Sequence, residues 1–438
     1  MKKRTRVLSM ALAGLLAVSM TACSSGTAGG EGGEGGEAAA SGEVITIKFS
    51  LSHAATEPAV QAANEFAEEM AEKSGGTLKV EVYPDNQLGS ERDVIEGLQL
   101  HTVEMADPAN AVLSNFIDSM NLFELPMLFE NKQHVYAVLD DIGMQFADEC
   151  EAQGFKLLGW FDMGSRHIMT VSKPINSLAD IQGLKIRVQE SPANMAGMAC
   201  FGAAPTLMSY NELYTSLESG VLDGAEAAAT NYYQKAFWEV APNWAKVNWF
   251  ECVNPVLMDL QFYNNLSDEH KQILEECVAN MIPRERQLYA ESEVYYEELL
   301  EEEGINITVP DRQEWQDCCH VAYEEFADRV GGMEAIEAVI NYDYSSYEMP
   351  EGIGPDGVPV EGAEAAAPAE DAAAEEAPAE DAAAEEAPAE DAAAEEAAAE
   401  EAPAEDAAAE EAPADDAAAE EAPAEEAAEE APAEEAAE

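Results

Sequence analysis

The middle of the chain alternates between strand-like and helix-like segments, and this alternation constrains the fold more than any other feature. Three short stretches, rich in apolar and β-branched residues, are predicted strands. They are residues 44–49, 77–83 and about 103–106. Between them lie two predicted helices, residues 56–74 and a short segment after Ser90. This βαβαβ order predicts a parallel sheet with helices on its faces.

A second set of alternating segments follows. Strands are predicted at residues 155–161, 167–171 and 184–188, and helices at 191–200 and 211–219. Ser267 then caps a long helix that has acidic residues in its first turn. Pro283 should kink or split this helix, and a second segment should run to about Glu303.

These patterns favour a receptor over an enzyme. The chain has no glycine-rich dinucleotide loop after a strand, no phosphate-binding loop and no nucleophile elbow. We therefore predict an α/β fold of the periplasmic-binding-protein type, in which two lobes close like a Venus flytrap. Mixed sheets are flanked by helices and the long helix links the lobes. Lobe I would comprise residues 43–163 and 253–290, and lobe II residues 164–252 and 291–349. The ligand is expected in the cleft beyond the carboxyl ends of the strands.

The N-terminus has the pattern of a bacterial lipoprotein signal. Residues 1–22 combine a basic start, an apolar run and small residues directly before Cys23. We predict cleavage before Cys23 and a lipid on its sulfur, although Met20 stands where Leu is commoner. An ordinary signal peptide with a chance cysteine is the alternative. Residues 23–42, mostly Gly, Ser, Ala and Glu, would form a tether, placing the protein outside the cytoplasm and anchored to the cell membrane.

The C-terminus is an acidic Ala/Glu/Pro repeat. Proline recurs between residues 368 and 432, and no basic residue follows residue 360. Because proline interrupts helices and like charges repel, residues 350–438 are predicted to be disordered. Passive solvation, a cell-wall spacer and an ion-binding tail are the possible roles. The formal net charge of −68 excludes nucleic acid as a default partner, since its phosphates must be neutralised by Lys and Arg.

Six cysteines remain after Cys23, and we expect buried thiols rather than bridges. The cluster Cys318-Cys319-His320 lacks further ligands at metal-binding spacing. No metal and no cofactor are predicted.

Several motifs in a fixed order resemble one known family. They are Gly164-Ser-Arg166, Lys173-Pro-Ile175, residues 177–188 ending in Gly-Leu-Lys-Ile-Arg-Val188, Gly202-Ala-Ala-Pro-Thr206, residues 211–226, Tyr83–Arg92, Leu125–Phe129 and Leu266–Glu269. Over about residues 43–349 the chain resembles the DctP-type solute-binding subunits of tripartite ATP-independent periplasmic (TRAP) transporters. The resemblance implies a monomeric, non-enzymatic receptor. It would bind a small organic anion and deliver it to a small and a large permease subunit, with an ion gradient driving import.

Arg187 is the principal candidate for holding the ligand. It closes an apolar strand at the predicted cleft, and a guanidinium matches a carboxylate with two parallel hydrogen bonds. An internal salt bridge is the alternative, but the resemblance implies the carboxylate clamp. Arg166 ends the preceding strand, and the resemblance makes it a second contact to the acid, with an interlobe salt bridge as the alternative.

Four further residues are candidates. The resemblance implies that Arg92 contacts the ligand or supports the clamp, and that Glu226, in the motif Asp-Gly-Ala-Glu, belongs to the binding site. His53, at the end of the first strand, is either a ligand contact or a loop residue. Many family members carry an Asn after this Glu, where Ala227 stands here; Asn231 is the candidate replacement.

The sequence around Arg187 and Glu226 is most similar to the sugar-acid branch of the family, which favours a uronate. A C4-dicarboxylate, a 2-oxo acid or an aromatic acid could also fit. The alternative function is a binding protein of similar fold that serves an ATP-driven importer or a sensor kinase.

Overall fold

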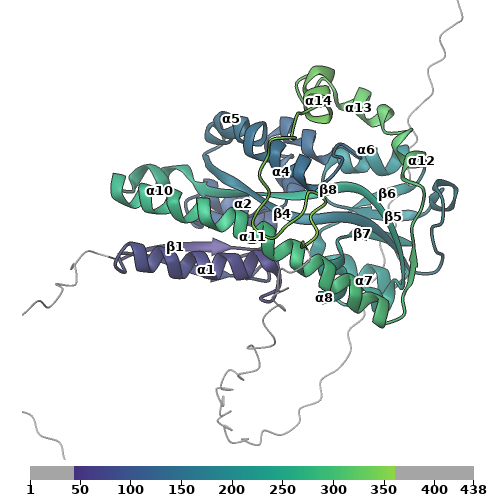
Figure 1. Ribbon diagram of the computed structural model, residues 1–438, viewed down its shortest axis with the longest axis horizontal. Helices are drawn as coiled ribbons and strands as arrows, with labels where there is room; N and C mark the ends of the chain where they lie inside the picture. Colours follow the sequence, from purple (N-terminus) through teal and green to yellow (C-terminus); the bar gives the residue numbers. More distant parts are fainter. Residues whose placement is uncertain (1–43, 361–438) are drawn as a thin grey trace, which may run out of the picture. The chain divides into compact units, whose positions relative to one another are not determined.

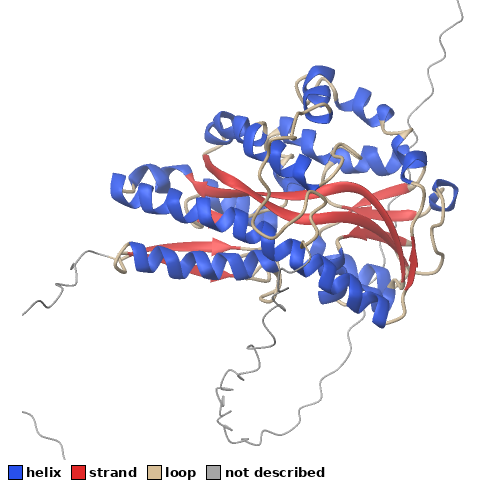
Figure 2. Cartoon of the chain, in the orientation of Figure 1, coloured by secondary structure: helices blue, strands red, loops and turns tan. Residues whose placement is uncertain are grey.

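The computed structural model describes residues 44–360. Cys23, the predicted signal and tether, and the repeat from residue 361 onward lie outside the described residues. Within residues 44–360 one mixed, nine-stranded sheet is flanked by helices (Figures 1 and 2), as predicted for the fold class. Its strand order is β2-β1-β3-β8-β4-β7-β5-β6, and β9 pairs with β8.

The N-terminal βαβαβ unit is confirmed. Strand β1 (Ile45–Ser50) lies between β2 (Leu78–Tyr83) and β3 (Met105–Ala106) and is parallel to both. The connecting helices are α1 (Pro58–Lys73) and α2 (Glu91–Gln99). Ser90 forms a capping box with Asp93, which explains why α2 begins there.

Two long antiparallel strands form the centre of the sheet. They are β4 (Phe155–Thr170) and β8 (Asn243–Asp259). The two strands predicted at 155–161 and 167–171 are therefore one strand. A register shift between Asp162 and Ser165, with Gly164 at φ +80°, interrupts the regular pattern without ending the strand. Because β4 and β8 run through the whole sheet, the strands form one sheet rather than two.

The second half of the sheet carries the family motifs. Strand β5 (Lys185–Val188) is parallel to β6 (Ala204–Leu207) and β7 (Gly224–Ala227), and β7 is antiparallel to β4. The helices here are α6 (Pro192–Cys200), α7 (Leu213–Glu218), α8 (Ala229–Gln234) and α9 (Phe237–Val240). Strand β9 (Asn306–Thr308) pairs in parallel with β8.

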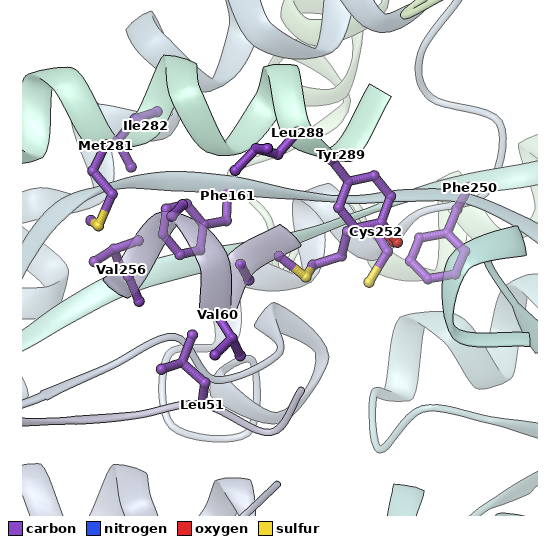
Figure 3. Close-up of a cluster of buried hydrophobic side chains, with 14 of the residues drawn as sticks. Leu51, Val60, Phe161, Phe250, Cys252, Val256, Met281, Ile282, Leu288 and Tyr289 are labelled. Carbon is purple, nitrogen blue, oxygen red and sulfur yellow. The ribbon is translucent and has the colours of Figure 1, made fainter. Parts of the chain in front are cut away.

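The long helix α11 (Asp268–Glu302) passes through Pro283 without a break. The predicted split is wrong. An interior proline costs a helix about 3 kcal/mol, but the helix is held by packing on both sides of it. Met281 and Ile282 before the proline, and Leu288 and Tyr289 after it, pack into the largest core cluster (Figure 3). Helix α11 contacts α1, β4 and α8.

The other helices complete the covering layers. They are α3 (Asn110–Leu113), α4 (Lys132–Asp141), α5 (Ala147–Ala152), α10 (Leu260–Asn265), α12 (Arg312–Gln316), α13 (His320–Phe326) and α14 (Met333–Ile340), with 3₁₀ turns at Asp118–Glu124, Gly143–Phe146, Leu178–Ile181 and Tyr210–Glu212. No helix within residues 44–360 is long and apolar enough to cross a membrane.

The C-terminal helices pack back onto the first half of the chain. Buried side chains of α13 and α14 share a core cluster with those of α2 to α5. Residues 350–360, which the sequence assigned to the tail, also pack here: Gln133 N–H donates to the Pro355 carbonyl at 2.9 Å. The predicted lobe boundaries stay a prediction, since residues 44–360 belong to one contact unit.

The six cysteines of residues 44–360 are unpaired in the structure, and the expected absence of bridges stays a prediction. Four are buried, whereas Cys200 and Cys318 are partly exposed.

Candidate ligand-binding site

A cavity lies beyond the carboxyl ends of β1 and β5, at the place predicted for the ligand. It encloses about 560 Å³ of empty space, including the part that is open to solvent. Four of the six predicted ligand contacts line it: Arg187 from β5, Arg166 from β4, His53 after β1, and Asn231 from α8. The other lining residues are Ser52, Glu57, Glu91, Ala109, Val112, Met163, Gln189, Glu190, Ser209, Tyr210, Cys252, Asn254 and Tyr289.

The two arginines share one carboxylate. Arg187 Nη1 lies 2.9 Å from Glu226 Oε1, and Arg166 Nε lies 2.6 Å from Glu226 Oε2. The sheet order β4-β7-β5 explains this geometry, because Glu226 on β7 stands between the strands of the two arginines. All three side chains are at most 2% exposed.

The shared carboxylate leaves the guanidiniums incompletely paired. Arg187 also donates from Nε to the Met208 carbonyl at 3.0 Å, and Arg166 from Nη2 to the Glu226 carbonyl at 3.3 Å. Arg187 Nη2 and Arg166 Nη1 donate no hydrogen bond to any described residue. Burial lowers the pKa of Arg187, against the attraction of Glu226. Two guanidiniums against one carboxylate leave one excess positive charge at the cavity wall.

Glu226 itself does not line the cavity. It is fully buried behind the arginines, so the structure places it as their support rather than as a ligand contact. The internal salt bridge considered for Arg187 thus forms. Arg166 pairs with the same carboxylate, which belongs to the same predicted lobe, so the interlobe bridge considered for it is not the contact seen. Both arginines still line the cavity.

A second group of residues at the cavity is acidic. His53 lies 3.3 Å from both Glu57 and Asp107. Burial alone would lower the pKa of His53, but the attraction of Asp107 and Glu57 raises it well above the ordinary value. Glu91 accepts from the Ala109 N–H at 3.0 Å and the Ser52 hydroxyl at 3.3 Å, and burial raises its pKa. The imidazole of His53 is therefore held between two carboxyl groups.

Two buried acceptors in the cavity wall have no partner among the described residues. They are Gln189 Oε1 and Asn254 Oδ1, on side chains that are 8% and 1% exposed. Gln189 Nε2 donates to Cys252 Sγ at 3.4 Å, and Asn254 Nδ2 donates to the Asp107 carbonyl at 2.8 Å. A buried acceptor without a donor is costly, so these oxygens suit a ligand that brings donors of its own.

Asn231 is presented by the first turn of α8. Its Oδ1 accepts from the Ala228 N–H at 3.0 Å, while its Nδ2 has no hydrogen bond to a described residue. An amide N–H₂ therefore faces the cavity. Ala227, where many family members have Asn, is 1% exposed.

Arg92 lies apart from this cavity. It is exposed on α2, and its guanidinium carbon is 5.5 Å from the centre of the Phe116 ring. The neighbouring Glu91 faces the cavity instead. Consecutive helical residues point in different directions, and no sequence pattern distinguishes which of the two faces the cavity.

The sequence analysis missed most of the other residues that line the cavity. Gln189 carried a usable signal, because it lies two positions after Arg187 and period-two alternation puts both side chains on one face. Asn254 and Glu57 carried no such signal. They reach the cavity through the pairing of β8 and the start of α1, which only the three-dimensional fold brings together.

The fold and this cavity define the class of bacterial extracytoplasmic solute-binding proteins, in which a small molecule is held at strand ends by a few converging polar groups. The chain belongs to one family of that class, the DctP family, described as "Bacterial extracellular solute-binding protein, family 7". The family model matches residues 49–329. The members are solute-binding receptors, which in general catalyse no reaction.

Two relatives indicate the range of similarity. The C4-dicarboxylate-binding periplasmic protein DctP of Rhodobacter capsulatus is 30% identical over 304 residues, which cover 68% of this chain and 90% of that protein. The 2,3-diketo-L-gulonate-binding periplasmic protein YiaO of Escherichia coli strain K12 is 28% identical, with 62% and 84% covered.

Two solved structures of TRAP periplasmic solute-binding proteins have the same fold. One, from a Bradyrhizobium species in complex with D-galacturonate, is 30% identical with a TM-score of 0.65 and covers 68% of this chain and 100% of that chain. The other, from Anaerococcus prevotii with bound D-glucuronate, is 26% identical with a TM-score of 0.65 and covers 69% and 99%.

Proposed function

We propose that the protein is the extracytoplasmic receptor of a TRAP transporter and binds an organic acid, with a sugar acid such as a uronate favoured. Arg187 holds the carboxylate and Arg166 provides a second contact. The observation that carries the proposal is the pair of buried arginines, which share Glu226 and retain unpaired donors at the cavity wall. A ligand carboxylate would supply the missing acceptors and neutralise the excess positive charge.

The comparisons support this class of ligand. The two relatives named above are called binding proteins for an acid, C4-dicarboxylate or 2,3-diketo-L-gulonate. The two structures contain a bound acid, galacturonate or glucuronate. A carboxylate is common to all of them, whereas the rest of the molecule varies. A carboxylate clamp combined with lining residues that suit the rest of one particular acid is consistent with that pattern.

The lining residues other than the arginines favour hydroxyl groups over a second carboxylate. Gln189 Oε1 and Asn254 Oδ1 are acceptors that lack donors, and Glu91 adds a carboxylate. The hydroxyls of a sugar acid would donate to all three. The second carboxylate of a dicarboxylate would instead approach Glu91 and Glu57, at a cost in like-charge repulsion.

The remaining steps of the proposal rest on the N-terminal sequence pattern and on the resemblance to the family. The receptor is a monomer that is anchored to the membrane through lipidated Cys23. Ligand binding biases an equilibrium between open and closed arrangements of the two lobes. The closed form delivers the acid to the small and large permease subunits.

Calorimetry on Arg187→Ala tests the proposal. A thermal-shift screen of uronates, aldonates, dicarboxylates and 2-oxo acids first identifies the cognate acid, because a ligand that binds the native state raises the melting temperature. Loss of a buried, hydrogen-bonded partner costs about 2–5 kcal/mol, which corresponds to a loss of affinity between about 30-fold and several thousand-fold. Arg92→Ala, an exposed arginine outside the cavity, is the matched control and should bind normally.

Arg187→Lys separates charge from geometry. Lysine keeps the charge but cannot form the bidentate fork, so affinity should stay well below that of the wild type. Unchanged affinity in Arg187→Ala, with a folded protein, would remove the clamp assignment. A screen in which only neutral sugars or peptides raise the melting temperature would remove the organic-acid proposal itself.

A further inference from the structure

Three cysteines meet where α6 ends against the turn between α12 and α13. Cys200 is the last residue of α6, and Cys318 and Cys319 directly precede α13. Helices α6 and α13 (His320–Phe326) are in contact, and the thiol of Cys200 lies next to those of Cys319 and Cys318. The neighbouring rings of Phe201 and Trp315 pack edge to face, with centres 5.0 Å apart. Two segments far apart in sequence are thus fixed against each other at this point.

The three thiols have only weak partners of their own. Cys200 donates to the Gly197 carbonyl at 3.0 Å, and Cys318 and Cys319 donate to the Trp315 carbonyl at 3.0 and 3.4 Å. The other described cysteines, Cys150, Cys252 and Cys277, are each buried among residues other than cysteine. The contact between cysteines is therefore specific to this place in the fold.

We propose that Cys200 and Cys318 form a disulfide bond in the exported protein, joining the end of α6 to the start of α13. These two thiols are the partly exposed members of the cluster, whereas Cys319 is 1% exposed and sits in the core. Adjacent cysteines rarely bond each other, which leaves Cys200 as the partner. Proteins outside the cytoplasm are exposed to oxidising conditions in which such bonds persist.

The bond forms while the chain folds. In the native fold burial raises the pKa of Cys318 to about 12, and a thiol held neutral in this way is a poor nucleophile. During folding the thiols still have their ordinary pKa of about 8.5.

The oxidant is the disulfide of a dithiol oxidoreductase or of a small thiol compound. One cysteine thiolate attacks the oxidant disulfide, and the second cysteine then displaces the remaining sulfur. One Sγ–Sγ bond forms, both cysteines lose their protons, and the two electrons reduce the oxidant to two thiols, which take up the protons.

The bridge would stabilise one wall of the binding cavity. Helix α6 follows β5 directly, and Arg187 and Gln189 precede its Ser191 cap. A bond between Cys200 and Cys318 closes a long loop of the chain, which restricts the unfolded state. We expect oxidation to raise the midpoint of thermal unfolding by about 5 °C or more.

Peptide mapping of the exported full chain tests the proposal. Free thiols are blocked by alkylation under denaturing conditions, and the protein is then digested without reductant. The expected result is one peptide pair that links Cys200 to Cys318, together with unlinked Cys150, Cys252 and Cys277. The same pair should form when reduced protein is refolded in a glutathione buffer, but slowly or not at all when native protein is oxidised.

Variants distinguish the bridge from general thiol oxidation. Cys200→Ser should lose both the linked peptide and the rise in thermal midpoint, whereas Cys277→Ser, at a buried site away from the cluster, should retain both. Full alkylation of all the thiols after export and after refolding would overturn the proposal. So would a bridge that joins other cysteines, or a bound soft metal ion that protects the three thiols.

Discussion

Lys132→Met is the most informative perturbation of the fold, because it removes the cation from a buried ionic cluster. Lys132 Nζ lies 2.7 Å from Asp162 Oδ1 and 2.8 Å from Glu251 Oε2, and none of the three residues is more than 4% exposed. The cluster joins α4 to β4 and β8 at the bulge between Asp162 and Ser165. It therefore holds the irregular point of the two strands that run through the whole sheet.

The expected loss of stability follows from these contacts. Removing one partner of a buried ion pair costs about 3–5 kcal/mol, because the other charge is left uncompensated. Here two carboxylates lose the same cation. Other donors to them remain, including Tyr136 to Asp162 at 2.6 Å and Asn248 to Glu251 at 2.9 Å. We therefore expect about 3–5 kcal/mol at neutral pH, rather than twice that figure.

The pH dependence provides a sharper test. Burial would raise the pKa of Glu251, but Lys132 lowers it overall. Without Lys132 the folded pKa should rise above the unfolded value, so the folded variant binds the additional proton. Its stability then falls as pH rises through that interval. The difference between variant and wild type should be smaller at pH 5 than at pH 8.

Urea denaturation followed by tryptophan fluorescence measures both effects. Lys156→Met is the control, because Lys156 is partly exposed and, among residues 44–360, forms one ion pair, with Glu151 at 3.2 Å, and one cation–π contact, with Tyr263. Its stability should be close to that of the wild type. A loss below about 1 kcal/mol for Lys132→Met, or an equal loss at pH 5 and pH 8, would refute the reasoning.

Three further predictions concern charge. Burial raises the pKa of Glu293 to about 7, so the folded state holds this proton more tightly than the unfolded state. The contribution of Glu293 to wild-type stability should therefore fall as the pH rises from about 4.5 to about 7. Denaturation at a series of pH values should show a flatter slope for Glu293→Gln. Glu226→Gln leaves two buried arginines without their carboxylate, so the melting temperature without ligand should fall and the rise on adding the cognate acid should grow; an unchanged rise would contradict the shared-carboxylate arrangement. The net charge of −68 repels an anionic ligand, so the association rate in stopped-flow fluorescence should increase with salt up to about 150 mM, and a decrease would indicate local steering by the arginines.

Local sequence patterns predicted the elements whose boundaries are set locally. The caps at Ser90 and Ser267, and the βαβαβ order from residue 45 to 106, appear in the structure where expected. The patterns failed where distant contacts decide the outcome. Gly164 looks like the end of a strand, but Lys132 and Glu251 hold the chain in β4 on both sides of it.

The binding residues divide in the same way. Arg187 closes a predicted strand and His53 follows one, so topology alone placed them near the cavity. Arg166 was expected at a strand end but lies inside β4. The role of Glu226 depends on β7 lying between β4 and β5, an order that no local pattern specifies. Arg92 and Glu91 are neighbours on α2 whose side chains leave the helix in different directions. How α2 packs decides which of the two faces the cavity.

The arrangement of the arginines also suggests why a ligand would favour a closed form. Without a ligand, Arg187 Nη2 and Arg166 Nη1 have no hydrogen-bond acceptor among the described residues, and Gln189 Oε1 and Asn254 Oδ1 have no donor. Excluding water from such groups costs free energy for each one left unpaired. A sugar acid brings a carboxylate for the donors and hydroxyls for the acceptors, and so removes both costs at once. Closure would then be favourable only with a ligand that carries both, which makes the pairing of polar groups, rather than bulk charge, the basis of selectivity.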